Sequence, residues 1–274
     1  MKMIDTHSHL YTEEFDEDRD EAVARAREAG VSRLIFPAID SESHDRLFAT
    51  ARRYAGYCAV MMGLHPTSVN DNPRWREELE IVERTLTQAP PEGIDRFVAV
   101  GEIGLDFYWS RDFVAEQTEA FVFQLRLAAR LGLPVAIHTR DAWGEMVEIL
   151  TQESRAARER GEELRGVLHA YSDSIETYRA LREVGRFKFG IGGVVTFKKS
   201  PLAEVVREME LEDLLLETDC PYLTPAPFRG KRNESGYISY ICHKIAELKG
   251  VEAEEVARIT TKNADALFGL GMEH

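Results

Sequence analysis

Two histidines close to the start of the chain, His7 and His9, are separated by a single residue. In an extended strand, side chains two positions apart point to the same face, so both imidazoles can bind one cation. Taken alone, a His-x-His pair is weak evidence for a metal site, because core and surface histidines share this spacing. The pair becomes informative only if further ligands converge on it.

Four further ionisable residues occur late in apolar segments elsewhere in the chain, namely Glu102, His138, His169 and Asp219. Charged groups are almost never buried without a partner, and a bound divalent cation compensates for the water that they lose. Taken singly, each residue has a simpler explanation. Glu102 could pair with Arg140, and His138 or Asp219 could cap a helix or turn. Taken together with the histidine pair, they predict a metal site built from imidazoles and carboxylates.

Six ligands are more than one catalytic ion uses, since a catalytic zinc site has about three protein ligands and an open position. We therefore expect two divalent metal ions. The donor set suits zinc, manganese, nickel or iron, and magnesium is compatible where carboxylates and phosphate dominate. Two ions about 3.5–4 Å apart lower the pKa of a shared water toward about 7 and stabilise the oxygens of a phosphoryl displacement. The site therefore predicts hydrolysis.

The elements that would position these residues are strands alternating with helices. Eight short apolar runs are typical of parallel strands covered on both faces, and they span 3–9, 33–39, 57–65, 97–105, 134–139, 166–170, 187–192 and 214–219. Helical periodicity occurs between them at 15–29, 43–54, 75–86, 113–131, 143–152, 175–184 and 202–209. The α/β pattern predicts a (β/α)8 TIM barrel, with a doubly wound open sheet as the alternative. In a barrel the carboxyl ends of all strands meet at one mouth, so the six ligands become neighbours.

Length and composition fit one folded domain. The chain has 274 residues, of which 44% are hydrophobic and 30% are charged, and it contains no Pro/Gly/Ser-rich linker. We therefore expect a single domain over residues 1–274. The segment 234–270 predicts additional C-terminal helices packed outside the barrel, and 151–164 predicts a solvated helical extension.

Charge and cysteine usage exclude several classes of protein. A net charge of −14 argues against broad attraction to nucleic acid or anionic membranes, although a local basic rim can still bind phosphate. The three cysteines are widely spaced and predict neither a disulfide framework nor a thiolate zinc site. No uncharged apolar stretch approaches the roughly 18 residues of a membrane span, and the first residues lack a signal-peptide core. We expect a cytoplasmic protein that does not enter a membrane.

The loops after the strands contain candidates for substrate binding. His65, at the end of the third strand, could orient substrate or water, and a helix cap is an equally good explanation. Cations that could pair with substrate phosphates are Arg140, Lys198, Arg229 and Arg232. Tyr108 and Trp109 could stack bases, although packing at the rim is the commoner role. Gly190 could let the substrate approach closely, or could serve a tight turn.

These motifs resemble the TatD family of metal-dependent hydrolases, within the amidohydrolase superfamily of barrels. The matching blocks are DTHSHL at 5–10, GLHP at 63–66, GEIGLDF at 101–107, IHTRDA at 137–142, GVLH at 166–169 and LETDCPYLTP at 216–225. Segments 229–234 and 263–268 extend the match nearly end to end. The family usually has His-Cys-Phe-Ser where this chain has HAYS at 169–172, and Pro where it has Ser235. These differences affect the pocket lining and leave every ligand in place.

The resemblance implies that His7, His9, Glu102, His138, His169 and Asp219 are the metal ligands. Glu102 would bridge the two ions, and neither the fourth nor the fifth expected strand has a lysine that could replace this carboxylate. We assign His7, His9 and Asp219 with Glu102 to one ion, and the remaining two histidines with Glu102 to the other. Asp219 would also accept the proton of the attacking water and return it to the leaving oxygen.

The resemblance also implies a DNase that trims single strands from one end, with DNA preferred to RNA as the nucleic-acid substrate. No obligate protein partner is expected. The same site is compatible with a D-aminoacyl-tRNA deacylase or another ester or amide hydrolase, because metal chemistry does not separate these substrates. A noncatalytic scaffold is disfavoured, since all six ligand positions are intact.

Overall fold

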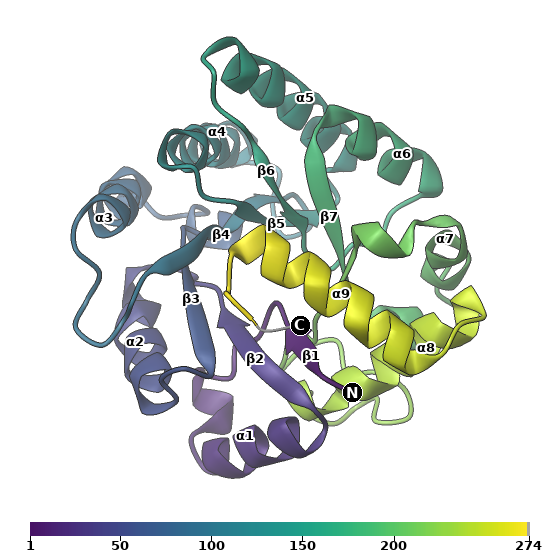
Figure 1. The fold of residues 1–274 in the computed structure, drawn as a ribbon. Helices are drawn as coiled ribbons and strands as arrows, with labels where there is room; N and C mark the ends of the chain where they lie inside the picture. Colours follow the sequence, from purple (N-terminus) through teal and green to yellow (C-terminus); the bar gives the residue numbers. More distant parts are fainter. Residues whose placement is uncertain (273–274) are drawn as a thin grey trace.

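Eight parallel strands form the core of the computed structural model, which describes residues 1–272. The strands are β1 (Met3–Asp5), β2 (Val31–Phe36), β3 (Cys58–Met62), β4 (Phe97–Asp106), β5 (Val135–Arg140), β6 (Arg165–Leu168), β7 (Arg186–Ile191) and β8 (Leu214–Leu216). Each strand pairs in parallel with the next, in the order β1 to β8 (Figure 1). A parallel bridge between Ser8 and Cys220 joins the two ends of this sheet. The barrel prediction is therefore confirmed, and the open sheet is wrong.

The helices surround the strands, as Figure 1 shows. They are α1 (Arg19–Glu28), α2 (His44–Arg53), α3 (Trp75–Thr87), α4 (Val114–Leu131), α5 (Trp143–Glu159), α6 (Ile175–Val184), α7 (Leu202–Glu208), α8 (Ile238–Lys249) and α9 (Ala253–Phe268). The first helix begins at Arg19, later than the apolar pattern predicted, because Glu13–Phe15 forms a separate 3-10 turn. Helix α5 continues to Glu159, so much of the predicted helical extension at 151–164 is present.

Local sequence explains the helix ends. Gly132 after α4 and Gly250 after α8 adopt left-handed conformations with φ of 66°, which glycine reaches without steric strain. At the start of α6, the Ser174 hydroxyl accepts the backbone N–H of Thr177 at 3.1 Å, a side-chain cap that satisfies a free donor. These ends fix where each loop leaves its helix and enters the next strand.

The two C-terminal helices occupy different places. Helix α8 packs beside α7, whereas α9 crosses one open end of the barrel (Figure 1). Leu267 and Phe268 of α9 join an inner apolar cluster with Ile4, Val98 and Ala136 from the barrel strands. We expected the tail helices outside the barrel, and α9 instead closes the end opposite the candidate site. Its apolar face replaces water that would otherwise contact the barrel interior.

None of the helices in residues 1–272 combines the length and the apolar character that a membrane crossing requires.

Candidate metal centre

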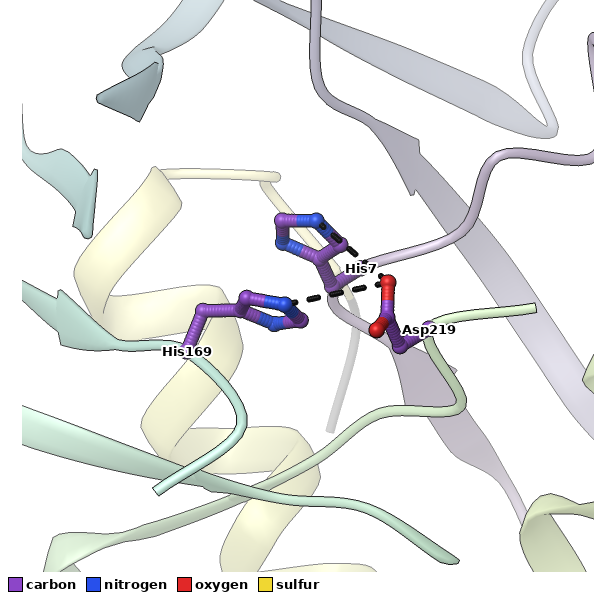
Figure 2. A group of neighbouring side chains, drawn as sticks. All are labelled: His7, His169 and Asp219. Atoms are coloured by element: carbon purple, nitrogen blue, oxygen red, sulfur yellow. Dashed lines mark ion pairs between the residues drawn. The ribbon is translucent and has the colours of Figure 1, made fainter. Parts of the chain in front are cut away.

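The structure brings all six predicted ligands together at the carboxyl ends of the strands. They are His7 and His9 after β1, Glu102 in β4, His138 in β5, His169 after β6 and Asp219 after β8. Figure 2 shows the imidazoles of His7 and His169 beside the carboxylate of Asp219. Residues separated by more than 200 positions in the chain thus face one another, because a closed barrel gathers its strand ends.

His7 and His9 point to the same place, with 3.2 Å between their Nε2 atoms. Regular pairing of β1 ends at Asp5, and the chain bends at Thr6 and His7 before the bridge between Ser8 and Cys220. The N–H of His9 then donates to the carbonyl of Cys220 at 2.9 Å, which holds the second imidazole beside the first. Both side chains are almost completely buried.

The carboxylate of Glu102 lies between two groups of histidines. Its Oε2 atom is 3.0 Å from His7 Nε2 and 3.7 Å from His9 Nε2. Its Oε1 atom is 3.0 Å from His138 Nδ1 and 3.8 Å from His169 Nε2. Ligand atoms around a tetrahedral ion with bonds of about 2.1 Å lie about 3.4 Å apart, so this spacing fits cation binding. Each carboxylate oxygen thus faces a different group of imidazoles.

Asp219 lies on the more open side of the cluster. Its Oδ1 atom is 3.4 Å from His9 Nε2, 3.7 Å from His169 Nε2 and 4.0 Å from His7 Nε2. Its side chain is 14% exposed, against 3% for Glu102. The Asp219 backbone has a φ of 56°, a left-handed conformation that costs an ordinary residue roughly 1–2 kcal/mol. This conformation lies three residues beyond the end of β8 and accompanies the turn that directs the carboxylate toward the histidines.

His65, which the sequence suggested for orienting substrate or water, lies directly beside the predicted ligands. Its Nε2 atom is 3.4 Å from Glu102 Oε1, and its Nδ1 atom is 2.7 Å from the Thr67 hydroxyl. Within residues 1–272, the donor atoms of His65, Glu102 and His138 form one of three groups compact enough to hold a cation. The histidine was identified from the sequence, but its proximity to Glu102 was not.

The two candidate carboxylates are ionised. Burial opposes the charge on Glu102, but His7, His65 and His169 outweigh it and hold the pKa of this carboxyl well below its usual range. Burial also opposes the charge on Asp219, whose pKa is nevertheless lowered by His169 and His9. Both groups can therefore offer charged oxygens to a cation at neutral pH.

Two of the histidines hold a proton in the absence of a cation. Burial favours neutral His138, but hydrogen bonds with Asp106 and Glu102 raise its pKa to about 9. Burial likewise opposes the charge on His169, and the carboxylates of Glu217 and Asp219 raise its pKa to about 10. A metal ion binds only an imidazole nitrogen that has lost its proton. A bound cation would therefore replace the protons, and their positive charge, on His138 and His169.

Two buried carboxylates that the sequence analysis did not single out orient these histidines. Asp106 Oδ2 is 2.9 Å from His138 Nε2, the nitrogen that points away from Glu102. Glu217 Oε1 is 3.0 Å from His169 Nδ1 and accepts the N–H of Ala170 at 2.6 Å. A carboxylate on the far nitrogen of a ligating histidine fixes its ring and tautomer. Both residues lie within the sequence blocks that match the family, at 101–107 and 216–225. This position is the feature of the sequence that could have identified them.

Gly190 makes room for Glu217. A β-carbon at this position would lie 2.0 Å from Glu217 Oε2, far inside van der Waals contact. The sequence suggested that this glycine admits substrate or forms a tight turn. The structure shows that it admits the carboxylate that contacts His169.

The candidate substrate-binding cations differ in their surroundings. The guanidinium of Arg140 lies 3.5 Å from the ring centre of Tyr108, and that of Arg229 lies 4.2 Å from the ring centre of Phe197. Lys198 is exposed and has no ion pair within residues 1–272. Arg232 donates to Asp18 Oδ2 at 2.7 Å, so a phosphate would have to compete with this carboxylate.

Comparison with known proteins places the chain in a family. A family model described as "TatD related DNase" matches residues 4–269. The metal-dependent hydrolase YabD of Bacillus subtilis is 38% identical, covering 97% of this chain and 98% of YabD. The 3'-5' ssDNA/RNA exonuclease TatD of Erwinia amylovora is 33% identical, covering 98% of this chain and 100% of the relative.

A solved structure shows the same architecture. The crystal structure of the TatD homolog YjjV of Escherichia coli K12 superposes with a TM-score of 0.85 at 29% identity, covering 97% of this chain and 98% of that one. The resemblance drawn from the motifs is thereby confirmed over nearly the whole length. The chain belongs to the family of TatD-related DNases.

Proposed function

We propose that this protein is a metal-dependent nuclease that removes nucleotides from one end of single-stranded nucleic acid, with DNA as the preferred substrate. The observation that carries the proposal is the Glu102 carboxylate, whose two oxygens face separate groups of histidines at the barrel mouth. The Erwinia amylovora relative named as a 3'-5' ssDNA/RNA exonuclease supports the choice of substrate class. A mouth lined by loops also suits the entry of one strand end.

The proposed ligands divide into two sets that share Glu102. His7, His9 and Asp219 complete one set, and the second set consists of Glu102, His138 and His169. The donors are imidazole nitrogens and carboxylate oxygens, which suit zinc, manganese, nickel, iron or magnesium. Cys220 is near in sequence, but its sulfur contacts the hydroxyls of Ser8 and Ser235.

Divalent ions held by these residues would provide an acidic water near neutral pH and would stabilise negative charge on phosphoryl oxygens. Asp219 is ionised and more exposed than Glu102. We assign to it the acceptance of the proton from the attacking water and its return to the leaving oxygen. Glu102 is buried among histidines and is assigned the role of the shared ligand. Arg140, Lys198 and Arg229 are assigned to substrate phosphates, which guanidinium and ammonium groups bind well.

The first test compares two conservative variants, Glu102→Gln and Asp219→Asn. A neutral amide bridges two cations poorly, so Glu102→Gln is expected to lose one metal equivalent together with at least about 100-fold in rate. Asp219→Asn is expected to lose more rate than metal, because it removes the proton acceptor. Metal content by emission spectrometry and release of labelled nucleotides measure both effects.

Glu153→Gln is the matched control, since Glu153 is a buried carboxylate on α5 paired with Arg126 away from the mouth. It should keep the metal content and rate of the unchanged protein. Full activity in purified Glu102→Gln or Asp219→Asn would refute the role assigned to that residue.

The second part of the test identifies the substrate. Protein stripped with a chelator and reloaded with single metals is assayed on end-labelled single-stranded DNA, on RNA and on D-aminoacyl-tRNA. Nucleotide release from DNA that depends on added metal supports the proposal. Deacylation of D-aminoacyl-tRNA without any cleavage of DNA would overturn it.

A further inference from the structure

Two large aromatic side chains are exposed side by side in the loop after β4. Tyr108 is 53% exposed and Trp109 is 68% exposed, with ring centres 5.0 Å apart at an interplanar angle of 85°. The guanidinium of Arg140, at the end of β5, lies 3.5 Å from the Tyr108 ring centre and 5.5 Å from that of Trp109. We call Tyr108, Trp109 and Arg140 the rim platform.

The rim platform is connected directly to the candidate metal centre. Asp106 Oδ1 accepts the backbone N–H of Tyr108 at 3.1 Å, while its Oδ2 lies 2.9 Å from His138 Nε2. The N–H of Phe107 donates to the carbonyl of Arg140 at 2.9 Å, which ties the two halves of the platform together. One buried carboxylate therefore positions both a proposed metal ligand and the backbone of the first platform residue.

In the described part of the chain, the positive charge of the platform is not held in a direct ion pair, although the Arg140 charge helps to lower the pKa of the nearby Asp106. Within residues 1–272, neither Arg140 nor the nearby Arg111 has an ion pair, and Arg111 donates only to the carbonyl of Asp141. Several other exposed arginines are paired, as in Arg46 with Asp16, Arg53 with Asp20 and Arg76 with Glu119, whereas exposed Arg74, Arg84 and Arg258 also have no ion pair within residues 1–272. The two guanidinium groups are therefore free to bind phosphate.

The opposite side of the mouth has the opposite charge. The loop after β1 carries five acids that line a hollow together with Arg232, namely Glu13, Glu14, Asp16, Glu17 and Asp18. Asp16 and Asp18 are paired with arginines, whereas the three glutamates have no ion pair within residues 1–272. Because β1 and β5 are four places apart in a closed barrel of eight strands, this loop and the rim platform lie on opposite sides. A polyanion is repelled by one side and attracted by the other, so the strand should leave the mouth over the platform.

We propose that the rim platform is a nucleobase subsite, on which a base next to the scissile phosphate stacks against Trp109, whose ring Tyr108 supports edge-on, while Arg140 contacts the adjoining phosphate. This inference rests on the proposed nuclease function and adds to it the group that selects unpaired strands. Every base has a π face, so such stacking is tolerant of sequence. A base in a duplex is already stacked and paired, so duplex ends bind this subsite poorly.

The experiment measures binding without turnover. The probe is a fluorescein-labelled tetradeoxythymidylate with cleavage-resistant phosphorothioate linkages, titrated with manganese-loaded protein by fluorescence polarisation. Trp109→Ala should weaken binding by about 10-fold, the size expected for one lost base stack. Trp109→Phe should keep most of the affinity, and Tyr240→Ala, at an exposed aromatic on α8, should leave it unchanged.

A second probe with an abasic residue at the 3′ position completes a double-mutant cycle. The missing base should weaken binding to the unchanged protein about as much as Trp109→Ala does, and should weaken binding to Trp109→Ala no further. An abasic penalty that is the same in both proteins, unaltered affinity in Trp109→Ala, or absence of any binding would overturn the subsite.

Cleavage of ordinary tetradeoxythymidylate is followed separately, so that the two proposals can fail independently. If the unchanged protein cleaves DNA but Trp109→Ala binds the probe equally well, the nuclease function is supported and the subsite is refuted. The expected binding cycle without any cleavage would support the subsite and overturn the nuclease function.

Discussion

At the scale of single residues, His138 and His169 each have two ring nitrogens with different neighbours. His138 faces Glu102 with Nδ1 and Asp106 with Nε2, while His169 faces Glu102 with Nε2 and Glu217 with Nδ1. His138 and His169 present different nitrogens to Glu102 because Asp106 contacts Nε2 of His138, whereas Glu217 contacts Nδ1 of His169. Each such carboxylate raises the basicity of the ring and fixes its direction.

The raised pKa values of His138 and His169, about 9 and about 10, predict proton release on metal binding. Both imidazoles hold a proton at pH 7 in cation-free protein, and a cation displaces it, so roughly two protons should leave. Metal affinity should therefore increase with pH from 7 toward about 9, as deprotonated rings become more abundant. Calorimetric titration at pH 7, in buffers with different ionisation enthalpies, measures the number of protons released.

Asp106→Asn provides the control for this measurement. It removes a carboxylate that raises the pKa of His138, so fewer protons should be released per bound metal. If the unchanged protein released no protons at pH 7, the protonation of these two histidines would be disproved.

Sequence reasoning was effective for residues whose type alone indicates the chemistry. His7, His9, Glu102 and Asp219 were placed together because strand ends of a barrel converge. Asp106 was missed because its role depends on the direction of the His138 ring, which no spacing in the sequence specifies. Glu217 was missed because its role likewise depends on the direction of a histidine ring. A carboxylate next to a strand is also compatible with a purely structural role.

At the scale of elements, the strand ends at the mouth differ most from the sequence expectation. Regular pairing in β6 ends at Leu168, and β8 ends at Leu216. The following residues Ala170 and Asp219 have positive φ values of 46° and 56°, which a strand does not accommodate. Hydrophobic runs reveal where a strand starts, whereas left-handed turns by non-glycine residues leave no compositional mark. Such turns concentrate at functional sites.

Gly190 in β7 offers a test of how one strand supports a side chain of the next. Gly190→Ala places a methyl group 2.0 Å from Glu217 Oε2, so the carboxylate must shift from the position in which its Oε1 contacts His169. We expect metal affinity to fall by about 10- to 100-fold, the usual effect of losing such a supporting carboxylate. Competition with a chromogenic chelator measures the affinity.

Gly144→Ala is the matched control, because a β-carbon at Gly144 on α5 meets nothing within 4 Å. This variant should bind metal like the unchanged protein. An equally unaffected Gly190→Ala would show that Glu217 can shift without any consequence for the centre.

At the scale of the whole molecule, the two ends of the barrel have separate tasks. One end carries the ligands and the loops that surround them, and the other is closed by α9. The alternation of elements predicted the barrel from the sequence, but the position of α9 was not predictable. An amphipathic helix can cover the outside of a barrel or its open end, and its apolar periodicity is the same in both places.

This separation predicts that a change in α9 alters stability without altering the reaction. Phe268 is 2% exposed in the inner cluster, so Phe268→Ala should lower the free energy of unfolding by about 3–5 kcal/mol. The KM and the metal content should remain those of the unchanged protein at temperatures where the variant stays folded. Denaturant titration and steady-state kinetics measure the two effects.

Phe268→Leu should lower stability less, since it leaves a smaller cavity. A large change in KM with little loss of stability would contradict the independence of the two ends.

The bridge between Ser8 and Cys220, where the first strand meets the last, links the chemistry to the completion of the chain. His7 and His9 are made early, but Asp219 and the seam beside it are made only after β7. A nascent chain on the ribosome therefore holds an incomplete set of ligands until its last strand has been synthesised and docked. The proposed metal centre can therefore form only in a chain that has been synthesised through its last strand.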